Sequence, residues 1–112
     1  MVEIIAIIRP SKATATKRKL CEIGHPAFTC VKVNGRGKLP VERVLADGSV
    51  IKTGLINKRL FIIEARDEEE EKIINSIMEI NSTGTPGDGK IFVMNLETTY
   101  SVREGFCKRI IG

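Results

Sequence analysis

Short apolar segments alternate with amphipathic ones along most of the chain. Val2–Arg9 is an apolar, β-branched run that ends at Pro10, which predicts a buried strand. Phe28–Val33 alternates polar and apolar residues, as a half-buried strand does. Two further apolar runs, Lys58–Ala65 and Lys90–Leu96, predict two more strands, whereas the tail beyond them has a mixed pattern.

Two helices are predicted between these strands. Ser11–Gly24 forms the first, with Ser11 as its N-cap and Gly24 as the residue that ends it. The second begins at a capping box formed by Asp67 and Glu70. Its apolar residues repeat at helical spacing, at Ile73, Ile74, Ile77 and Met78.

The segment between residues 34 and 57 interrupts this regular pattern with glycines and a proline. Within it, Val41–Leu45 and Ser49–Ile51 predict a hairpin around the turn Asp47-Gly48. About 24 residues with so little regular structure are unusual inside a compact domain. Such a segment is typical of a functional loop or of a loop that a partner orders.

The predicted order is therefore β-α-β, a long loop, and β-α-β. This is the α+β ferredoxin-like split βαββαβ arrangement, in which both helices cover one face of an antiparallel sheet. In Ile4–Ile8 and Phe61–Ile63 both faces of the strand are apolar, so the face away from the helices is unsuited to water. We expect a single domain over residues 1–112 that forms oligomers through this open face.

The composition excludes several classes of protein. The 112 residues are 42% hydrophobic and 29% charged, as in one ordinary globular domain. No apolar run has the length of a membrane span, and the first residues lack the basic region of a signal peptide. Cys21, Cys30 and Cys107 lie far apart without a Cys-x-x-Cys motif, which predicts reduced thiols in a cytoplasmic protein and no metal site.

The charge distribution at first suggests a nucleic-acid partner. Eighteen Lys and Arg residues against fourteen Asp and Glu give a net charge of +4. The positive charge lies in residues 1–60, and the acidic block Asp67–Glu71 opposes it. Aromatic residues for base stacking are scarce at 4%, so nucleic-acid binding is disfavoured. With one His and no recognisable catalytic constellation, we expect no enzymatic activity.

Two glycine-rich segments have the composition of an anion site. Ser82–Lys90 combines three glycines with a terminal lysine, and Asn34–Lys38 combines two glycines with two basic residues. Both patterns are equally compatible with ordinary turns, and the spacing of a Walker A loop is absent. At Lys58 and Arg59 the strand alternation directs one cation to each face, where one of them can meet an anionic ligand.

Taken together, these motifs resemble those of PII signal-transduction proteins over the whole chain. The residues that are similar to the family's B-loop signature are Thr83, Gly84, Gly87, Asp88, Gly89, Lys90, Ile91, Phe92 and Val93. Ile7–Pro10 resembles the end of the family's first strand. Gly24, Thr29, Gly35 and Gly37 match positions that lead into the long T-loop, and Lys58 matches the lysine that follows this loop. A degraded C-loop is formed by Val102, Arg103 and Gly105.

The resemblance implies a homotrimer that binds ATP or ADP in clefts between subunits; a hetero-oligomer with a paralogue is the alternative if the ligand site has degraded. The T-loop would cover about residues 36–57, the B-loop 82–90 and the C-terminal loop 97–112. The ligand-binding residues would be Thr29, Gly35, Gly37, Lys38, Lys58, Thr83, Gly84, Gly87, Asp88, Gly89, Lys90 and Arg103.

The family also implies a role for several of these residues. Thr29 would lie near the adenine, and Gly37 and Lys38 near the phosphates, which the B-loop would hold together with Arg103 of the neighbouring subunit. Lys58 would pair with a carboxylate of 2-oxoglutarate when MgATP is bound. The T-loop would then dock on a target enzyme. Since this loop lacks a tyrosine, the chain looks most like the nitrogenase-regulating branch, which implies a nitrogenase component as the target.

The chain departs from the family at four positions. Leu39 replaces a glutamine that helps to set Mg²⁺ and 2-oxoglutarate, and leucine cannot ligate a hard cation. Ser101 replaces an arginine, Glu104 replaces a threonine, and Pro86 stiffens the B-loop. Losing one charge-assisted contact costs about 1.5–3 kcal/mol, or roughly ten- to a hundredfold in affinity.

These departures leave two alternatives to a ligand-binding regulator. One is a PII-like paralogue whose ligand site has degraded and which acts as a partner-dependent structural subunit. The other, which the scarce aromatics disfavour, is a basic ferredoxin-like nucleic-acid binder.

Overall fold

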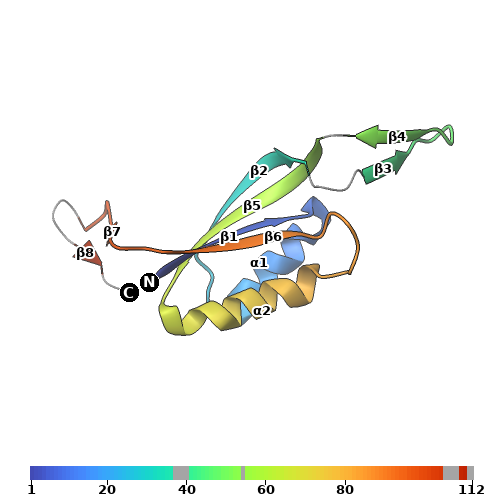
Figure 1. The fold of residues 1–112 in the computed structure, drawn as a ribbon. Coiled ribbons are helices and arrows are strands. Elements are labelled where there is room, and N and C mark those ends of the chain that lie inside the picture. Colours follow the sequence, from blue (N-terminus) through green and yellow to red (C-terminus); the bar gives the residue numbers. More distant parts are fainter. Residues whose placement is uncertain (37–40, 54, 105–108, 111–112) are drawn as a thin grey trace.

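A computed structural model of the chain describes residues 1–36, 41–53, 55–104 and 109–110. Its described elements are two α-helices, two short 3₁₀ turns, a four-stranded sheet and two small hairpins (Figure 1). In chain order they are β1 (Val2–Ile8), η1 (Pro10–Lys12), α1 (Ala13–Glu22), β2 (Thr29–Gly35), β3 (Val41–Val44), β4 (Val50–Thr53), β5 (Ile56–Ala65), η2 (Asp67–Glu69), α2 (Glu70–Asn81), β6 (Gly89–Asn95), β7 (Thr99–Tyr100) and β8 (Arg109–Ile110).

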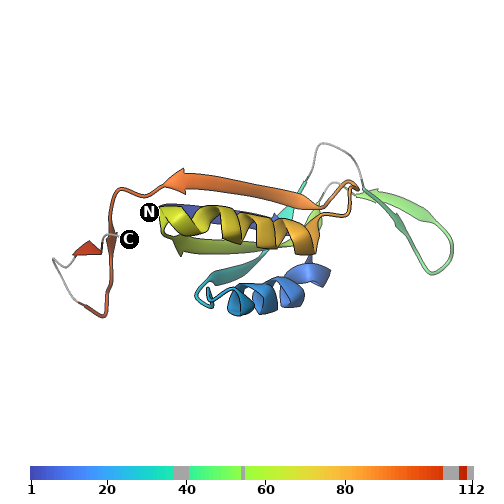
Figure 2. The ribbon, with the colours of Figure 1, turned by 90° about the horizontal axis from the view of Figure 1, so that it is seen from below.

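The four long strands form an antiparallel sheet in the order β2-β5-β1-β6. Both helices cover the same face of this sheet, side by side and in contact with each other (Figures 1 and 2). This arrangement confirms the predicted α+β ferredoxin-like fold. The central strand β1 pairs Ile5 with Ile62 on one side and with Phe92 on the other.

The core lies between the sheet and the helices. Every second residue of β1 is buried, as the side-chain alternation of a strand requires. Phe61 and Ile63 of β5 are fully buried against Leu20 of α1 and Ile77 of α2. Helix α2 is also tied to α1 by the side-chain amide of the buried Asn81, which donates to Thr16 Oγ1 at 3.0 Å.

The first helix differs from its prediction at the start and agrees with it at the end. Residues Pro10–Lys12 form the turn η1, so Ser11 lies inside this turn and makes no side-chain cap. The predicted N-cap at Ser11 is therefore wrong. Gly24 ends the helix as predicted, because His25 N–H donates to Leu20 O at 2.8 Å and Gly24 N–H to Cys21 O at 3.0 Å.

The capping box of the second helix lies one residue earlier than predicted. The Glu69 carboxylate accepts a hydrogen bond from Arg66 N–H at 3.2 Å, in place of a pair between Asp67 and Glu70. Asp67 instead accepts from the N-terminal ammonium group of Met1 at 2.7 Å. Asp67 thus forms a long-range ion pair and takes no part in the capping box. The local sequence pattern does not reveal this ion pair.

The long connection between β2 and β5 is more regular than its sequence suggests. β2 extends to Gly35 and β5 begins at Ile56, so both strands continue into the predicted loop. The predicted hairpin is confirmed by the pairing of Val44 with Val50, and Asp47 accepts from Ser49 N–H at 2.9 Å in its turn. Figure 1 shows that β3 and β4 project from one end of the sheet.

The middle of the sheet face opposite the helices is apolar. It carries Phe92, Val31 and Met94, which are 46%, 43% and 45% exposed, beside the less exposed Ile5 and Ile62. The tail, whose pattern predicts no element, forms the short pair β7–β8 at the other end of the molecule from the β3–β4 hairpin (Figure 1). None of the helices described is long and apolar enough to cross a membrane.

Candidate functional site

The glycine loop, residues 82–90, connects α2 to β6 and meets the end of β1. The pairing of Ile8 with Gly89 places the start of β6 beside the last residue of β1. Arg9 follows directly, and on the other side of β1 the same residue Ile8 faces Arg59 of β5. Three elements that are distant in sequence therefore bring Arg9, Lys58 and the glycine loop together.

The carboxylate of Asp88 organises the first half of this loop. Its Oδ2 accepts hydrogen bonds from the backbone N–H groups of Thr83 and Gly84 at 2.8 and 2.9 Å. Its Oδ1 accepts from the Thr83 hydroxyl and from the Arg9 guanidinium. These donors, the Thr83 hydroxyl foremost, hold the pKa of the Asp88 carboxyl far below its usual range, so that it stays ionised.

The guanidinium of Arg9 reaches the second half of the loop as well. Its Nη2 donates to Thr85 Oγ1 at 3.1 Å and to Pro86 O at 2.9 Å. Its Nη1 lies 3.4 Å from Thr83 Oγ1 and forms the ion pair with Asp88. One side chain thus contacts four of the six residues between 83 and 88.

Lys58 is a buried cation beside this network. The residue is 8% exposed, and its ammonium group donates to the carbonyl oxygen of Gly87. Burial is the main cause that lowers the pKa of Lys58, and the neighbouring positive charge of Arg9 lowers it further, whereas Asp88 opposes the shift. The sequence alternation correctly directs Lys58 and Arg59 to opposite faces, and the structure shows which of them meets the loop.

Two glycines of the loop are required by its geometry. Gly89 has φ +116°, and a Cβ atom there would lie 1.9 Å from the carbonyl oxygen of Ile7. Gly87 has φ +94°, and a Cβ atom would lie 3.4 Å from Arg9 Nη2 and 3.7 Å from Lys58 Nζ. A side chain at Gly89 would therefore collide with the backbone of Ile7 and disturb the pairing of β6, whereas at Gly87 the positive φ alone disfavours other residues.

The loop leaves backbone donors free. Within the part of the chain that the structure describes, the N–H groups of Gly87 and Asp88 have no hydrogen-bond acceptor. Free amides beside buried cations are a common way to bind an oxyanion such as phosphate or carboxylate. The chemistry of the site is thus that of anion binding, and the described residues include no group of His, Cys, Asp and Glu that could hold a metal ion.

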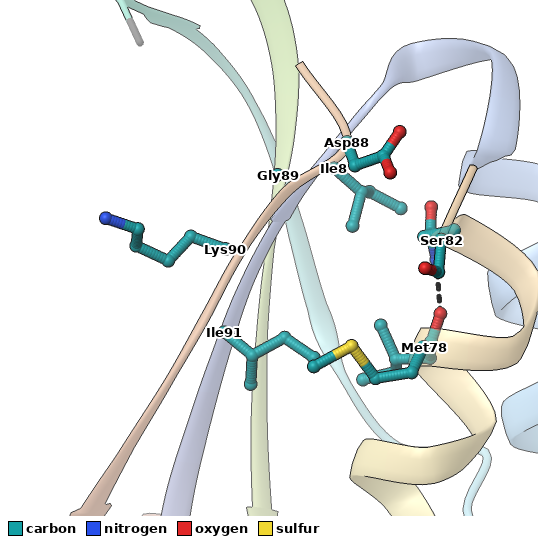
Figure 3. A pocket seen from close by; sticks show the side chains of 9 residues that line it. Ile8, Met78, Ser82, Asp88, Gly89, Lys90 and Ile91 are labelled. Atoms are coloured by element: carbon teal, nitrogen blue, oxygen red, sulfur yellow. Dashed lines mark hydrogen bonds between the residues drawn. The ribbon is translucent and has the colours of Figure 1, made fainter. Parts of the chain in front are cut away.

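The structure brings seven of the expected site residues into or beside this cluster. They are Thr83, Gly84, Gly87, Asp88, Gly89, Lys58, and Gly35, where an added Cβ atom would lie 3.5 Å from Lys58 Cγ. Lys90 follows in β6, paired with Ile7, and its side chain is exposed. In Figure 3 it points away from the Met78 side of the strand.

Other expected residues lie apart from the cluster. Thr29 begins the edge strand β2. It pairs with Ile62, which lies near the middle of the open face. Arg103 is exposed and follows β7, beyond the far end of β6 from the glycine loop. Gly37 and Lys38, like Leu39, lie outside the residues that the structure describes.

A shallow cavity of about 80 Å³ lies between the end of α2 and the start of β6 (Figure 3). Its lining is mainly apolar, from Ile8, Ile77, Met78 and Ile91, with Asp88 at its rim. Pockets for small molecules typically have about 300–1,000 Å³. This cavity is therefore too small to enclose a nucleotide.

Sequence reasoning missed Arg9 and Thr85 as members of the site. Arg9 resembles the exit of the family's first strand, and nothing in the local pattern connects it to a loop more than seventy residues away. The strand alternation did predict which face it lies on, because Arg9 falls on the same face as Ile5 and Ile7. Only the pairing of Ile8 with Gly89 shows that Arg9 lies beside the glycine loop.

Comparison with known proteins places this geometry in a family. The family model described as "Nitrogen regulatory protein P-II" matches residues 1–106. A "Nitrogen fixation nifHD region GlnB-like protein 2" of Methanothermobacter marburgensis is 34% identical, with 94% of each chain covered. A protein of the same name from Methanococcus maripaludis is 38% identical over 92% of this chain and 93% of its own.

The likeness extends beyond these two proteins. A "Nitrogen regulatory protein P-II" of Pyropia yezoensis is 35% identical, with 92% of each chain covered. The family match includes the sheet, both helices and the glycine loop with its cations. The chain belongs to the nitrogen regulatory protein P-II family.

Proposed function

We propose that this protein is a nitrogen regulator that binds ATP or ADP at the glycine loop and controls a target enzyme by direct contact. The observation that carries the proposal is the cluster formed by Lys58, Arg9 and the free amides of Gly87 and Asp88. A polyphosphate would meet the ammonium group of Lys58 and free backbone hydrogen-bond donors there, in a loop that Arg9 holds in place. The names of the relatives from Methanothermobacter marburgensis and Methanococcus maripaludis point to nitrogen fixation, and a nitrogenase component is the proposed target.

We further propose that the site is completed by a second copy of the chain in a homotrimer. The apolar open face, with Phe92 and Val31 nearly half exposed, supports association through the sheet. Arg103 and the glycine loop belong to opposite ends of β6. A seven-residue strand is about 23 Å long, so Arg103 can meet a bound phosphate only from a neighbouring chain.

The C-terminal turn supports a site with fewer cations than the family pattern. Ser101 Oγ accepts from Glu104 N–H at 3.4 Å, so the serine stabilises the turn where the family pattern has an arginine. We therefore expect weaker nucleotide binding than a full cation set would give. 2-Oxoglutarate would pair with Lys58, but Leu39 supplies no ligand for Mg²⁺.

Calorimetric titration with ATP, ADP, and MgATP plus 2-oxoglutarate tests the proposal. We expect saturable nucleotide binding, weakened about tenfold in Lys90→Met, since a charge-assisted contact is lost. Lys72→Met, which removes an exposed lysine of α2, is the matched control and should leave the affinity unchanged. No heat at high micromolar nucleotide would favour the alternative, a partner-dependent subunit with a degraded site.

A further inference from the structure

Arg9 has an unusual number of contacts for an arginine at the end of a strand. Its two terminal nitrogens contact Thr83, Thr85, Asp88 and the carbonyl oxygen of Pro86. These acceptors come from both halves of the glycine loop. The planar guanidinium can satisfy them simultaneously because its donors are fixed in one fork.

The same contacts define the shape of the loop. Asp88 folds the chain back on itself by accepting from the amides of Thr83 and Gly84. Arg9 holds that carboxylate on one side and the Thr85–Pro86 segment on the other. The loop is thus closed around the ion pair between Arg9 and Asp88. The free amides of Gly87 and Asp88 belong to the same part of the loop.

The positive charge of Arg9 is already used within the protein. Asp88 pairs with it, and the remaining donors of the guanidinium meet neutral oxygens of the loop. Lys58 donates to a carbonyl oxygen and the exposed side chain of Lys90 has no ion pair within the described residues. An incoming anion would therefore find Lys58 and Lys90 more available than Arg9.

From this geometry we propose that Arg9 is a positioning residue of the nucleotide site. It fixes the glycine loop so that the amides of Gly87 and Asp88 face the ligand before binding, and it does not itself contact the phosphates. This inference rests on the proposed nucleotide binding. A loop that is already ordered loses less conformational entropy when its ligand binds.

The test compares Arg9→Met, Arg9→Lys and Arg18→Met, the last as a control that removes an exposed arginine from α1. Hydrogen exchange of the Thr83 and Gly84 amides is measured without ligand, and ATP affinity is measured by calorimetry. We expect faster exchange at both amides in Arg9→Met, with ATP affinity reduced about ten- to a hundredfold. Arg9→Lys should restore little, because an ammonium group cannot reach all four acceptors.

The two measurements distinguish failure of the proposed ATP binding from failure of the proposed role of Arg9. If the wild type binds no ATP, the proposed function fails, while the exchange rates still report whether Arg9 orders the loop. Unchanged exchange in Arg9→Met, or full recovery of affinity in Arg9→Lys, would overturn the inference. If Arg9→Met does not fold, Thr85→Val removes one partner of Arg9 at the surface and should show the same two effects on a smaller scale.

Discussion

At the scale of single residues, the site depends on two groups whose pKa values the fold has lowered. Asp88 is held ionised by the donors of Thr83, Gly84 and Arg9. Lys58 loses part of its preference for the charged form through burial and through the nearby Arg9. Both pKa values lie below the ordinary ones, and each shift has a consequence that can be measured as a function of pH.

Asp88 should stabilise the fold only while it is ionised. Its folded pKa is lowered from 3.8, so its contribution is complete above that value and is lost as the pH falls towards the folded pKa. At pH 7 we expect Asp88→Asn to lower the midpoint of thermal unfolding by a few degrees. The gap between wild type and variant should begin to narrow below about pH 4 and should keep narrowing as the pH falls further. A gap that is constant down to about pH 3 would contradict the role given to this carboxylate.

Lys58 should make dicarboxylate binding sensitive to alkaline pH. Since the folded pKa of Lys58 is lowered from 10.5, the ammonium group loses its proton at a lower pH than an ordinary lysine does. With saturating MgATP we expect the affinity for 2-oxoglutarate to fall about tenfold as Lys58 deprotonates. In Lys58→Arg any remaining binding should show no such fall, because arginine stays charged. An unchanged alkaline profile in that variant would assign the effect to another group.

At the scale of elements, the pairing of β1 with β6 determines where the site forms. Most elements of the fold could be predicted, since the apolar run of β1 and the helical spacing in α2 are strong patterns. Contacts between distant elements could not be predicted, because a local sequence pattern does not show which residues of two strands pair with each other. The ion pair between the N-terminus and Asp67 is one such contact, and Arg9 was missed because the sequence does not show which residue pairs with Ile8.

The β1–β6 pairing should tolerate no side chain at Gly89. A Cβ atom there would collide with the backbone of Ile7, so we expect Gly89→Ala to lower the free energy of unfolding by about 3 kcal/mol. Gly48→Ala is the matched control, because Gly48 has a positive φ of +87° but no atom within 4 Å of a Cβ position. It should cost about 1 kcal/mol. Equal losses in urea unfolding would contradict the close contact at Gly89.

At the scale of the whole molecule, one chain presents half of the proposed site at each end. The glycine loop with its cations lies near the β3–β4 hairpin, and the tail with Arg103 leaves the opposite end of β6 (Figure 1). The principal extents of 58 × 26 × 21 Å reflect these two projections. Association through the open face would allow one chain's tail to approach the next chain's loop.

Association should depend on the apolar face rather than on exposed apolar residues in general. Phe92 on the open face is 46% exposed, and Met78 on α2 is 50% exposed. We expect Phe92→Glu to produce monomers in light scattering, because it places a charge in the apolar interface. Met78→Glu should remain oligomeric. Dissociation of both variants, or of neither, would contradict association through this face.

Complementation between two variants shows whether the nucleotide site is shared between chains. Lys90→Met chains lack part of the loop and Arg103→Ala chains lack the contact from the tail, so each alone should bind ATP weakly. If they are co-expressed, the Arg103→Ala loop can face the Lys90→Met tail, and about a quarter of the sites in random trimers should be intact. The account predicts ATP binding of wild-type affinity at that fraction of sites. A mixture that binds no better than either variant alone would contradict it.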